Sequence, residues 1–250
     1  MITGAWPVRD SPRFDYDART RMDYASLYQS RAQDYDAMIA REDAGQVLLN
    51  TIASIAPIRG HDLVDVGAGT GRVAIGLGAR GARSVHAVDA SEGMLAVLRD
   101  RARLEGVTRL TTTVADHEQL PLASACSDVT TSAWSVGHAT RTWESDWLPH
   151  VSRSISEMRR ITRPGGAVIV IETLGLPKRP LRPGLVAYHQ WLEKEQGFAR
   201  IELDTDFVFR SVEEADRLTR WFFGDATADE LVQTQSTRLP ERTGLWWRRV

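Results

Sequence analysis

Glycines at alternate positions follow an apolar stretch in the run Val64-Asp65-Val66-Gly67-Ala68-Gly69-Thr70-Gly71-Arg72. Positions without a side chain let the backbone turn sharply and lie directly against a ligand. A helix that starts after such a turn offers free backbone N–H groups. The run therefore predicts a small-molecule site between a strand and a helix, with a plain tight turn as the alternative.

The spacing of these glycines argues against a dinucleotide. A nicotinamide-dinucleotide fingerprint has glycines at its first, third and sixth positions, whereas this chain has Gly71 at the fifth and Arg72 at the sixth. Asp65, directly before the turn, also suits a ligand with a positive amine and a sulfonium better than a pyrophosphate. A dehydrogenase is therefore not expected.

Two more carboxylates end the next two expected strands: Asp89 closes SVHAVD, and Asp116 closes LTTTVAD. Open parallel sheets bind ligands outside the carboxyl ends of their strands, so Asp65, Asp89 and Asp116 are expected to line one crevice. Asp89 can accept hydrogen bonds from both hydroxyls of a ribose, because a carboxylate has two acceptor oxygens. Asp65 and Asp116 could each cap a local turn instead.

The surrounding sequence alternates short β-rich runs with helical patterns, which predicts βαβ units and a parallel sheet. A helix is expected from Glu42, with Val47, Leu48, Ile52 and Ile55 on one stripe. A later helix is expected to end at Arg163-Pro164-Gly165-Gly166, before the fully buried strand AVIVIE.

One domain with three parts is the simplest organisation. Residues 1–41 are expected to form a cap or lid, and 42–175 the binding core. Residues 176–250 are expected to complete the sheet and cover the acceptor pocket, with helices in LVAYHQWLEKEQG and SVEEADRLTRWFFG and a last strand in TGLWWRRV.

Composition narrows the function classes. A net charge of −2 and the lack of a Lys/Arg-rich run argue against nucleic acid as a partner. The single cysteine, Cys126, and the absence of zinc-ligand spacing argue against a disulfide or a metal site. No leader or membrane-spanning stretch is recognisable, so a cytoplasmic location without membrane association is expected, and a homodimer is left open.

Over about residues 40–172 these motifs resemble the class I S-adenosylmethionine-dependent methyltransferases, particularly the small-molecule branch that includes ubiquinone-biosynthesis enzymes. The run from Ser127 to His138 and the turn at Arg163–Gly166 are also typical of that family. The resemblance implies a Rossmann-like, doubly wound α/β fold with seven mostly parallel strands, an antiparallel last strand, an N-terminal helical cap and a C-terminal helical insertion. It also implies S-adenosyl-L-methionine as cofactor and S-adenosyl-L-homocysteine as product.

The resemblance assigns cofactor-binding roles to particular residues. The glycine loop passes under the methionine part of the cofactor, and Asp89 holds the ribose. Met94 matches an apolar adenine contact, and Asp116 with His117 matches the adenine edge. Tyr35 sits where the family often closes over the methionine end, although a surface aromatic on a cap helix is an equal alternative. The residues implied are Asp65, Gly67, Gly69, Gly71, Asp89, Met94, Asp116, His117 and Tyr35.

Side chains beyond the fourth strand are candidates for the acceptor pocket. The indoles of Trp134 and Trp143 could bind an apolar or aromatic acceptor, or a cation, whereas helix packing explains Trp147 more simply. His138 could remove a proton from the acceptor, because its ordinary pKa lies near working pH. A loop histidine with satisfied hydrogen bonds is the alternative.

Three later residues are also candidates. Glu172 ends the fifth strand at the same sheet edge and could serve as the base. Tyr188 and His189 lie in the helix expected to cover the pocket, where packing explains them at least as well.

The predicted reaction is transfer of a methyl group to an O, N or C atom of a small molecule by in-line displacement, for which the protein mainly aligns the reactants and excludes water. One alternative is a protein of the same fold that binds the cofactor and guides a non-methylating reaction such as cyclisation. A methyltransferase of RNA or protein is a weaker alternative, motivated only by Arg242, Arg248 and Arg249.

Overall fold

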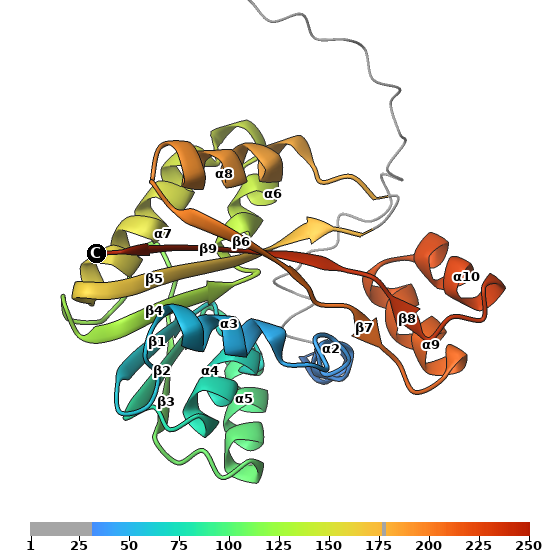
Figure 1. Cartoon of the computed structure of the whole chain (residues 1–250), viewed down its shortest axis with the longest axis horizontal. Helices are drawn as coiled ribbons and strands as arrows, with labels where there is room; N and C mark the ends of the chain where they lie inside the picture. The colour runs from blue at the N-terminus through green and yellow to red at the C-terminus, as the bar shows by residue number, and fades with distance from the viewer. Residues whose placement is uncertain (1–31, 177–178) are drawn as a thin grey trace, which may run out of the picture.

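A twisted sheet of seven strands, ordered β3-β2-β1-β4-β5-β9-β6, forms the centre of the computed structural model, which describes residues 32–176 and 179–250 (Figure 1). Strand β9 is antiparallel to both of its neighbours, and the other pairs are parallel. The mostly parallel sheet with an antiparallel last strand is thus confirmed. The strands are β1 (Asp62–Val66), β2 (Ser84–Asp89), β3 (Leu110–Val114), β4 (Ser127–Ala133), β5 (Thr162–Gly175), β6 (Ala199–Asp204) and β9 (Arg242–Arg249).

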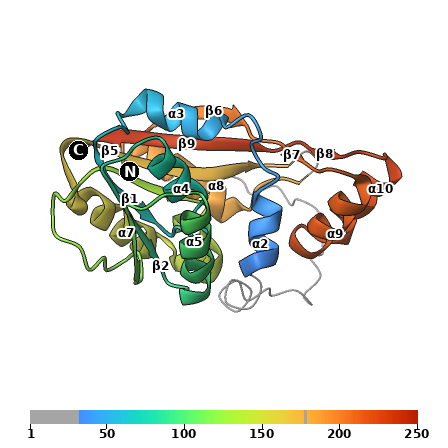
Figure 2. The same cartoon turned by 90° about the horizontal axis from the view of Figure 1, so that it is seen from below.

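Helices cover both faces of this sheet (Figures 1 and 2). One face carries α3 (Val47–Ile55), α4 (Arg72–Ala79) and α5 (Glu92–Leu104), and the other carries α6 (Ala139–Thr142), α7 (Leu148–Ile161) and α8 (Pro183–Lys194). Short 3-10 turns, η1 (Val136–His138) and η2 (Glu144–Asp146), flank α6.

The run AVIVI in β5, residues 167–171, is continuously apolar because both faces of the strand are covered. Successive side chains of a strand point to opposite faces. Ile169 and Ile171 pack with α3, α4 and α5, whereas Val168 and Val170 pack with α7 and α8. All four side chains are fully buried, as predicted for this strand.

A second, smaller cluster lies at one end of the sheet. It contains β7 (Phe207–Val208), α9 (Val212–Phe222), α10 (Asp225–Gln233), β8 (Arg238–Leu239) and α2 (Ala32–Ile39). Met38 of α2 packs here with Phe207, Phe209 and Leu218. The described part of the predicted cap therefore joins the C-terminal helices, while residues 1–31 lie outside the described residues.

Two expected boundaries were wrong. The helix expected from Glu42 begins at Val47, because Asp43 and Gln46 adopt left-handed backbone conformations. The Asp43 carboxylate accepts hydrogen bonds from the N–H groups of Val47 (2.8 Å) and Leu48 (3.0 Å), which satisfies the first turn. Val47 is consequently 40% exposed and not part of the buried stripe.

Likewise, Arg163–Gly166 lies within the first residues of β5 and not before it.

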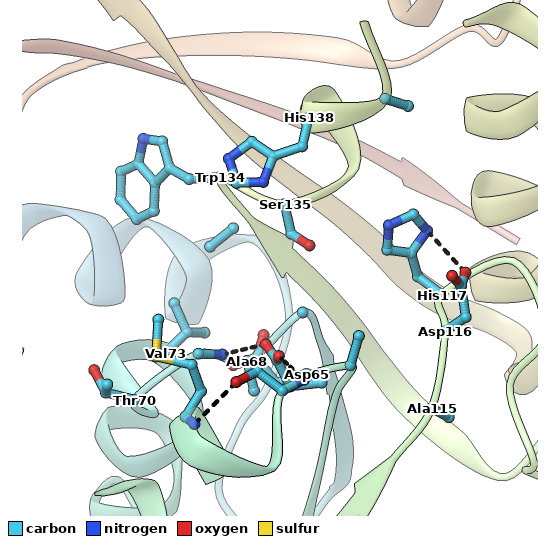
Figure 3. Close-up of a pocket in the computed structure, with 18 of the residues that line it drawn as sticks. Asp65, Ala68, Thr70, Val73, Ala115, Asp116, His117, Trp134, Ser135 and His138 are labelled. Atoms are coloured by element: carbon cyan, nitrogen blue, oxygen red, sulfur yellow. Dashed lines mark hydrogen bonds and ion pairs between the residues drawn. The ribbon is translucent and has the colours of Figure 1, made fainter. Parts of the chain in front are cut away.

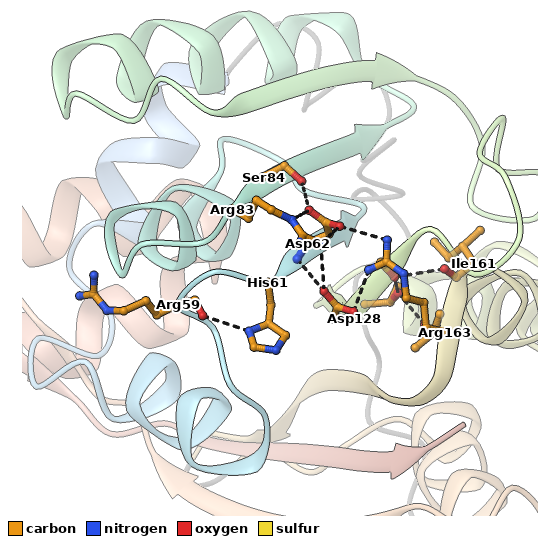
Figure 4. Close-up of polar contacts among 11 residues, drawn as sticks. Arg59, His61, Asp62, Arg83, Ser84, Asp128, Ile161 and Arg163 are labelled. Atoms are coloured by element: carbon orange, nitrogen blue, oxygen red, sulfur yellow. Dashed lines mark hydrogen bonds and ion pairs between the residues drawn. The ribbon is translucent and has the colours of Figure 1, made fainter.

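Charged side chains link the parallel strands to one another at the end of the sheet where these strands begin (Figure 4). Asp62 of β1 accepts hydrogen bonds from Arg83, before β2, and from Arg163 of β5. Arg163 also donates to Asp128 of β4 at 2.7 Å. The hydrogen bonds from Arg83 hold the pKa of Asp62 well below its usual range, so these contacts link four neighbouring strands at neutral pH.

At the opposite edge, Glu172 of β5 supports the turn that follows β4. Its buried carboxylate accepts the Gly137 N–H at 2.8 Å, and a Cβ added to Gly137 would lie 2.7 Å from Glu172 Oε1. Burial raises the pKa of Glu172 to about 8, although the Gly137 hydrogen bond acts in the opposite direction. The carboxyl group thus holds η1 against β5.

We expect Glu172→Gln to weaken the pH dependence of stability. Because the folded-state pKa lies above the unfolded value, the folded chain holds a proton between about pH 5 and about pH 8 that the unfolded chain releases. This contribution to stability is present at low pH and is lost as pH rises, on the order of 1 kcal/mol per pH unit. The glutamine keeps an oxygen acceptor for Gly137 and does not titrate, so the variant should gain stability relative to the native protein as pH rises.

Urea unfolding at several pH values measures this difference, with the exposed Glu195→Gln as the matched control. Parallel stability curves for Glu172→Gln and the native protein would contradict the assignment.

Candidate functional site

A cavity of about 410 Å³ opens where strands β1, β2, β3 and β4 end (Figure 3). This volume lies within the range of small-molecule pockets. Most of the residues predicted for the site line it: Tyr35, Asp65, Gly67, Gly69, Asp89, Met94, Asp116, His117, Trp134, His138 and Trp143.

The glycine turn forms one wall of the cavity. The N–H groups of Gly67 (2.8 Å) and Ala68 (2.9 Å) donate to the Val88 carbonyl, which ties the turn to β2. Gly67 has a φ of 69°, and a Cβ added there would lie only 1.9 Å from Ser135 Oγ. Glycine is therefore required at this position by both the backbone conformation and the contact with the β4 loop.

Unlike Gly67 and Gly69, Gly71 does not line the cavity. Its φ is 89°, and an added Cβ would lie 2.6 Å from Leu98 Cγ on α5. The third glycine of the motif thus allows close packing between the start of α4 and α5.

Asp89 lies at the centre of the contacts around the turn. Its Oδ2 accepts the Gly69 N–H at 2.8 Å, and its Oδ1 accepts the Ser91 N–H at 2.8 Å. Burial raises its pKa, although these two backbone hydrogen bonds favour the ionised form. Each oxygen retains a further lone pair, so the carboxylate can still accept hydroxyl donors in the cavity.

Asp65 is more deeply buried, and both of its oxygens are already engaged. Thr131 Oγ1 donates to one oxygen at 2.6 Å and the Ala74 N–H to the other at 3.1 Å. Burial raises its pKa to about 7. The carboxyl group thereby joins β1, β4 and α4 beneath the cavity.

Met94, Asp116 and His117 line another part of the cavity. The Ser91 hydroxyl caps α5 by accepting the Met94 N–H at 3.3 Å. Asp116 accepts the Glu118 N–H at 2.7 Å, which is the local turn-capping alternative, and it also faces the cavity. His117 Nδ1 lies 2.7 Å from the Ser154 hydroxyl.

Tyr35 connects the smaller cluster to the glycine turn. Its ring packs on Phe222 of α9, with a centroid distance of 5.9 Å. A Cβ added to Gly69 would lie 4.0 Å from Tyr35 Cε1. Burial, followed by the charge of Glu42, raises the pKa of the hydroxyl, so it remains protonated at neutral pH.

Trp134 and Trp143 are each held by a neighbour. Trp134 has a φ of 47°, unusual for a large side chain, and the Arg72 guanidinium lies 4.7 Å from its ring centroid. Arg72 is in turn paired with the buried Glu42 at 2.6 Å. Trp143 stacks on His150 at 3.9 Å with an interplanar angle of 5°. Both indoles line the cavity in defined positions.

His138 lies beside Trp134 and opposite Asp65 (Figure 3). Its pKa falls to about 4, first because burial disfavours the imidazolium ion and then because electrostatic interactions with His117, Arg141 and Arg182 act in the same direction. The imidazole is consequently neutral at neutral pH and has a nitrogen lone pair.

Three other predicted residues, besides Gly71, are not brought to the cavity. Glu172 contacts Gly137 behind η1, as described above. Tyr188 is buried beside Trp147, with ring centroids 6.2 Å apart, and His189 packs on Trp246 at 4.3 Å. Both Tyr188 and His189 belong to α8, and these contacts pack that helix against the rest of the protein.

Several lining residues were not predicted as site residues, among them Arg72, Ser135 and Arg141. Arg72 and Ser135 lie within the two motif runs quoted above, Val64–Arg72 and Ser127–His138, so their position in those runs was an available signal. Arg141 lies one turn after His138, but the single-turn helix α6 is too short to show a periodic pattern.

Within residues 32–176 and 179–250, no group of three His, Cys, Asp or Glu side chains is suitably arranged for a metal ion. None of the helices described there combines the length and apolar character needed to cross a membrane.

Comparisons with known proteins agree with this architecture. A family described as Methyltransferase domain matches residues 64–170. The chain is 33% identical over 153 residues to the ubiquinone/menaquinone biosynthesis C-methyltransferase UbiE of Ralstonia nicotianae, with 59% of each protein covered. It is 34% identical over 159 residues to the malonyl-[acyl-carrier protein] O-methyltransferase of Serratia marcescens, with 63% of this chain and 55% of that protein covered. The matches span less than two thirds of either relative.

Among solved structures, the [4+2]-cyclase SpnF is similar, with a TM-score of 0.63 and 18% identity over 90% of this chain and 95% of that chain. Identity this low shows the fold alone. The strand order with antiparallel β9, together with the sequence match, shows that residues 64–170 form a methyltransferase domain of the class I S-adenosylmethionine-dependent type.

Proposed function

We propose that this protein binds S-adenosylmethionine in the cavity and transfers its methyl group to a small-molecule acceptor. The observation that carries the proposal is the Asp89 carboxylate, which is oriented by the Gly69 and Ser91 N–H groups at the end of β2 and retains acceptor capacity toward the cavity. A ribose offers two adjacent hydroxyl donors that match two carboxylate oxygens.

The other lining residues fit the remaining parts of the cofactor. Met94 supplies an apolar surface for adenine, and Asp116 and His117 supply polar atoms for the adenine edge. The turn at Gly67 and Gly69 leaves room beside the backbone for the methionine part, which Tyr35 would cover.

The residues beyond β4 would hold the acceptor. The bound cofactor supplies a methyl group already activated by a sulfonium. Trp134 and Trp143 would orient the acceptor and exclude water, which accounts for much of the rate enhancement expected for such a displacement. His138 is the candidate for taking up the proton that an O or N acceptor loses, but its pKa of about 4 makes it a weaker base than the ordinary histidine expected from the sequence.

The likeness to a [4+2]-cyclase means that the fold by itself does not select methyl transfer over a cyclisation. Release of S-adenosylhomocysteine with small-molecule pools, compared with RNA and peptide pools, distinguishes these functions. Cofactor binding without release in any pool would favour the non-methylating alternative.

We expect Asp89→Ala to weaken binding of S-adenosylmethionine and S-adenosylhomocysteine about 100-fold or more. Two hydrogen bonds to a carboxylate contribute roughly 1.5–3 kcal/mol each, and the variant loses both. Calorimetric titration measures the affinities, with Asp100→Ala on the exposed surface of α5 as control. Equal affinities for the native protein and Asp89→Ala would exclude the ribose assignment, and no binding by the folded native protein would overturn the proposed function.

We expect Gly67→Ala to reduce cofactor binding at least tenfold and to destabilise the fold, because the new Cβ meets Ser135 and the backbone requires a positive φ. Gly60→Ala is a matched control, since Gly60 has a φ of 77° and no atom within 4 Å of an added Cβ. The free energy of unfolding of Gly60→Ala should fall only by the cost of a left-handed conformation for a residue with a Cβ, about 1–2 kcal/mol. Thermal unfolding and titration check both variants, and Ser135→Gly should partly rescue Gly67→Ala. Identical behaviour of the two alanine variants would show that the Ser135 contact is unimportant.

We expect His138→Ala to lower turnover about 100-fold while leaving S-adenosylhomocysteine affinity unchanged, if the transferred methyl goes to an atom that loses a proton. Single-turnover rates with the acceptor found in the pool screen measure this effect. Unchanged turnover would remove His138 from the role of base.

A further inference from the structure

Arg72 links the smaller cluster of helices to the acceptor side of the cavity. Its guanidinium lies 4.7 Å from the ring centroid of Trp134, and both residues line the cavity. The same guanidinium donates through Nη1 to Glu42 Oε2 at 2.6 Å. Three residues from distant parts of the chain therefore form one continuous series of contacts, from Glu42 through Arg72 to Trp134.

Glu42 is suited to fix the guanidinium in place. Its side chain is only 3% exposed, and its backbone forms an antiparallel bridge with Phe207 of β7. The neighbouring Asp43 lies 3.8 Å from Arg72 Nη2, but its carboxylate already accepts two backbone N–H groups at the start of α3. Although burial raises the pKa of Glu42, the charge and the hydrogen bond of Arg72 favour the ionised carboxylate. Glu42 is therefore the main partner of the guanidinium.

The Trp134 indole depends on a contact of this kind for its orientation. Its backbone has a φ of 47°, which large side chains rarely adopt, and its N–H donates to the Ile171 carbonyl at 2.7 Å. These features fix the main chain at the end of β4 but leave the side-chain torsions free. A planar guanidinium over the ring restricts the indole, because it is attracted to the ring face and can stack on it.

The segment that carries Glu42 also carries Tyr35, the residue proposed to cover the methionine part of the cofactor. Tyr35 lies on α2, and Glu42 follows shortly after that helix ends at Ile39. An ion pair of 2.7 Å between Asp36 and Arg101 joins α2 to α5. Docking of this one segment therefore places both the cover of the cofactor and the partner of Arg72.

Building on the proposed function, we propose that Glu42 is a positioning residue for methyl transfer, which acts through Arg72 to fix the Trp134 indole against which the acceptor binds. Glu42 itself does not line the cavity, so its effect on the acceptor is indirect. Docking of the segment with Tyr35 and Glu42 would prepare the cofactor side and the acceptor side of the cavity together.

The test first follows the indole itself, by fluorine NMR of the full chain labelled with 5-fluorotryptophan. Because the chain contains eight tryptophans, Trp134→Phe assigns the resonance of Trp134. We expect Glu42→Gln to shift or broaden this resonance, and Glu214→Gln, which breaks a similar ion pair with Arg41 at 3.0 Å, to leave it in place. The resonance should also move in Arg72→Lys, which keeps the charge and loses the planar group over the indole. An unchanged resonance in Glu42→Gln or in Arg72→Lys would overturn the proposal.

A double variant shows whether Glu42 acts through Arg72. Residues that act in one series of contacts are not additive, so adding Glu42→Gln to Arg72→Lys should change the Trp134 resonance little further. A full additional change in the double variant would show that Glu42 reaches the indole by another route, and it would overturn the proposal.

Kinetics then separate positioning of the acceptor from binding of the cofactor. With the acceptor that supports methyl release, Glu42→Gln should raise the KM for that acceptor about tenfold and leave the affinity for S-adenosylhomocysteine unchanged. An unchanged KM, or an equal loss of S-adenosylhomocysteine affinity, would contradict the assigned role. Failure of the native protein to bind S-adenosylhomocysteine would instead refute the proposed function, and the fluorine comparison does not depend on that result.

Discussion

The hydrogen bond from the Gly69 N–H to Asp89 links the ends of two neighbouring strands, and the cavity depends on it. It joins the turn after β1 to the carboxylate that ends β2, while the Val88 carbonyl holds the start of the same turn. Positive φ values at Gly67 and Gly69 make this path possible without side-chain clashes. The turn thereby becomes a wall with a carboxylate at its centre.

The supports of this wall come from distant parts of the chain. Asp65 binds Thr131 and the start of α4, which aligns β1 with β4 under the cavity. Glu172 performs a similar function for η1, and so it positions the turn that carries His138. Burial raises the pKa of both carboxyl groups. Their hydrogen bonds limit the free-energy cost of keeping them away from water.

The smaller cluster of helices adds the side of the cavity that the sheet cannot supply. Tyr35 reaches the glycine turn from α2, which packs on α9 through Met38; Arg41, just after α2, adds an ion pair with Glu214 of α9. Glu42, just after α2, pairs with Arg72 and so helps to hold the guanidinium over Trp134. Segments at both ends of the described chain therefore shape the region where the acceptor would bind.

The sequence by itself determined the parallel core and the residues that meet at its edge. Alternating apolar runs, the glycine spacing and an acid at each strand end are local patterns, and parallel strands bring their ends together whatever the connecting helices contain. Those patterns cannot show which side chains from outside the strand ends reach the cavity. Gly71 packs under α5, Tyr188 and His189 of α8 pack against Trp147 and Trp246, and Arg141 enters from a single-turn helix. Their positions depend on contacts between segments far apart in the chain, so only the tertiary structure decided them.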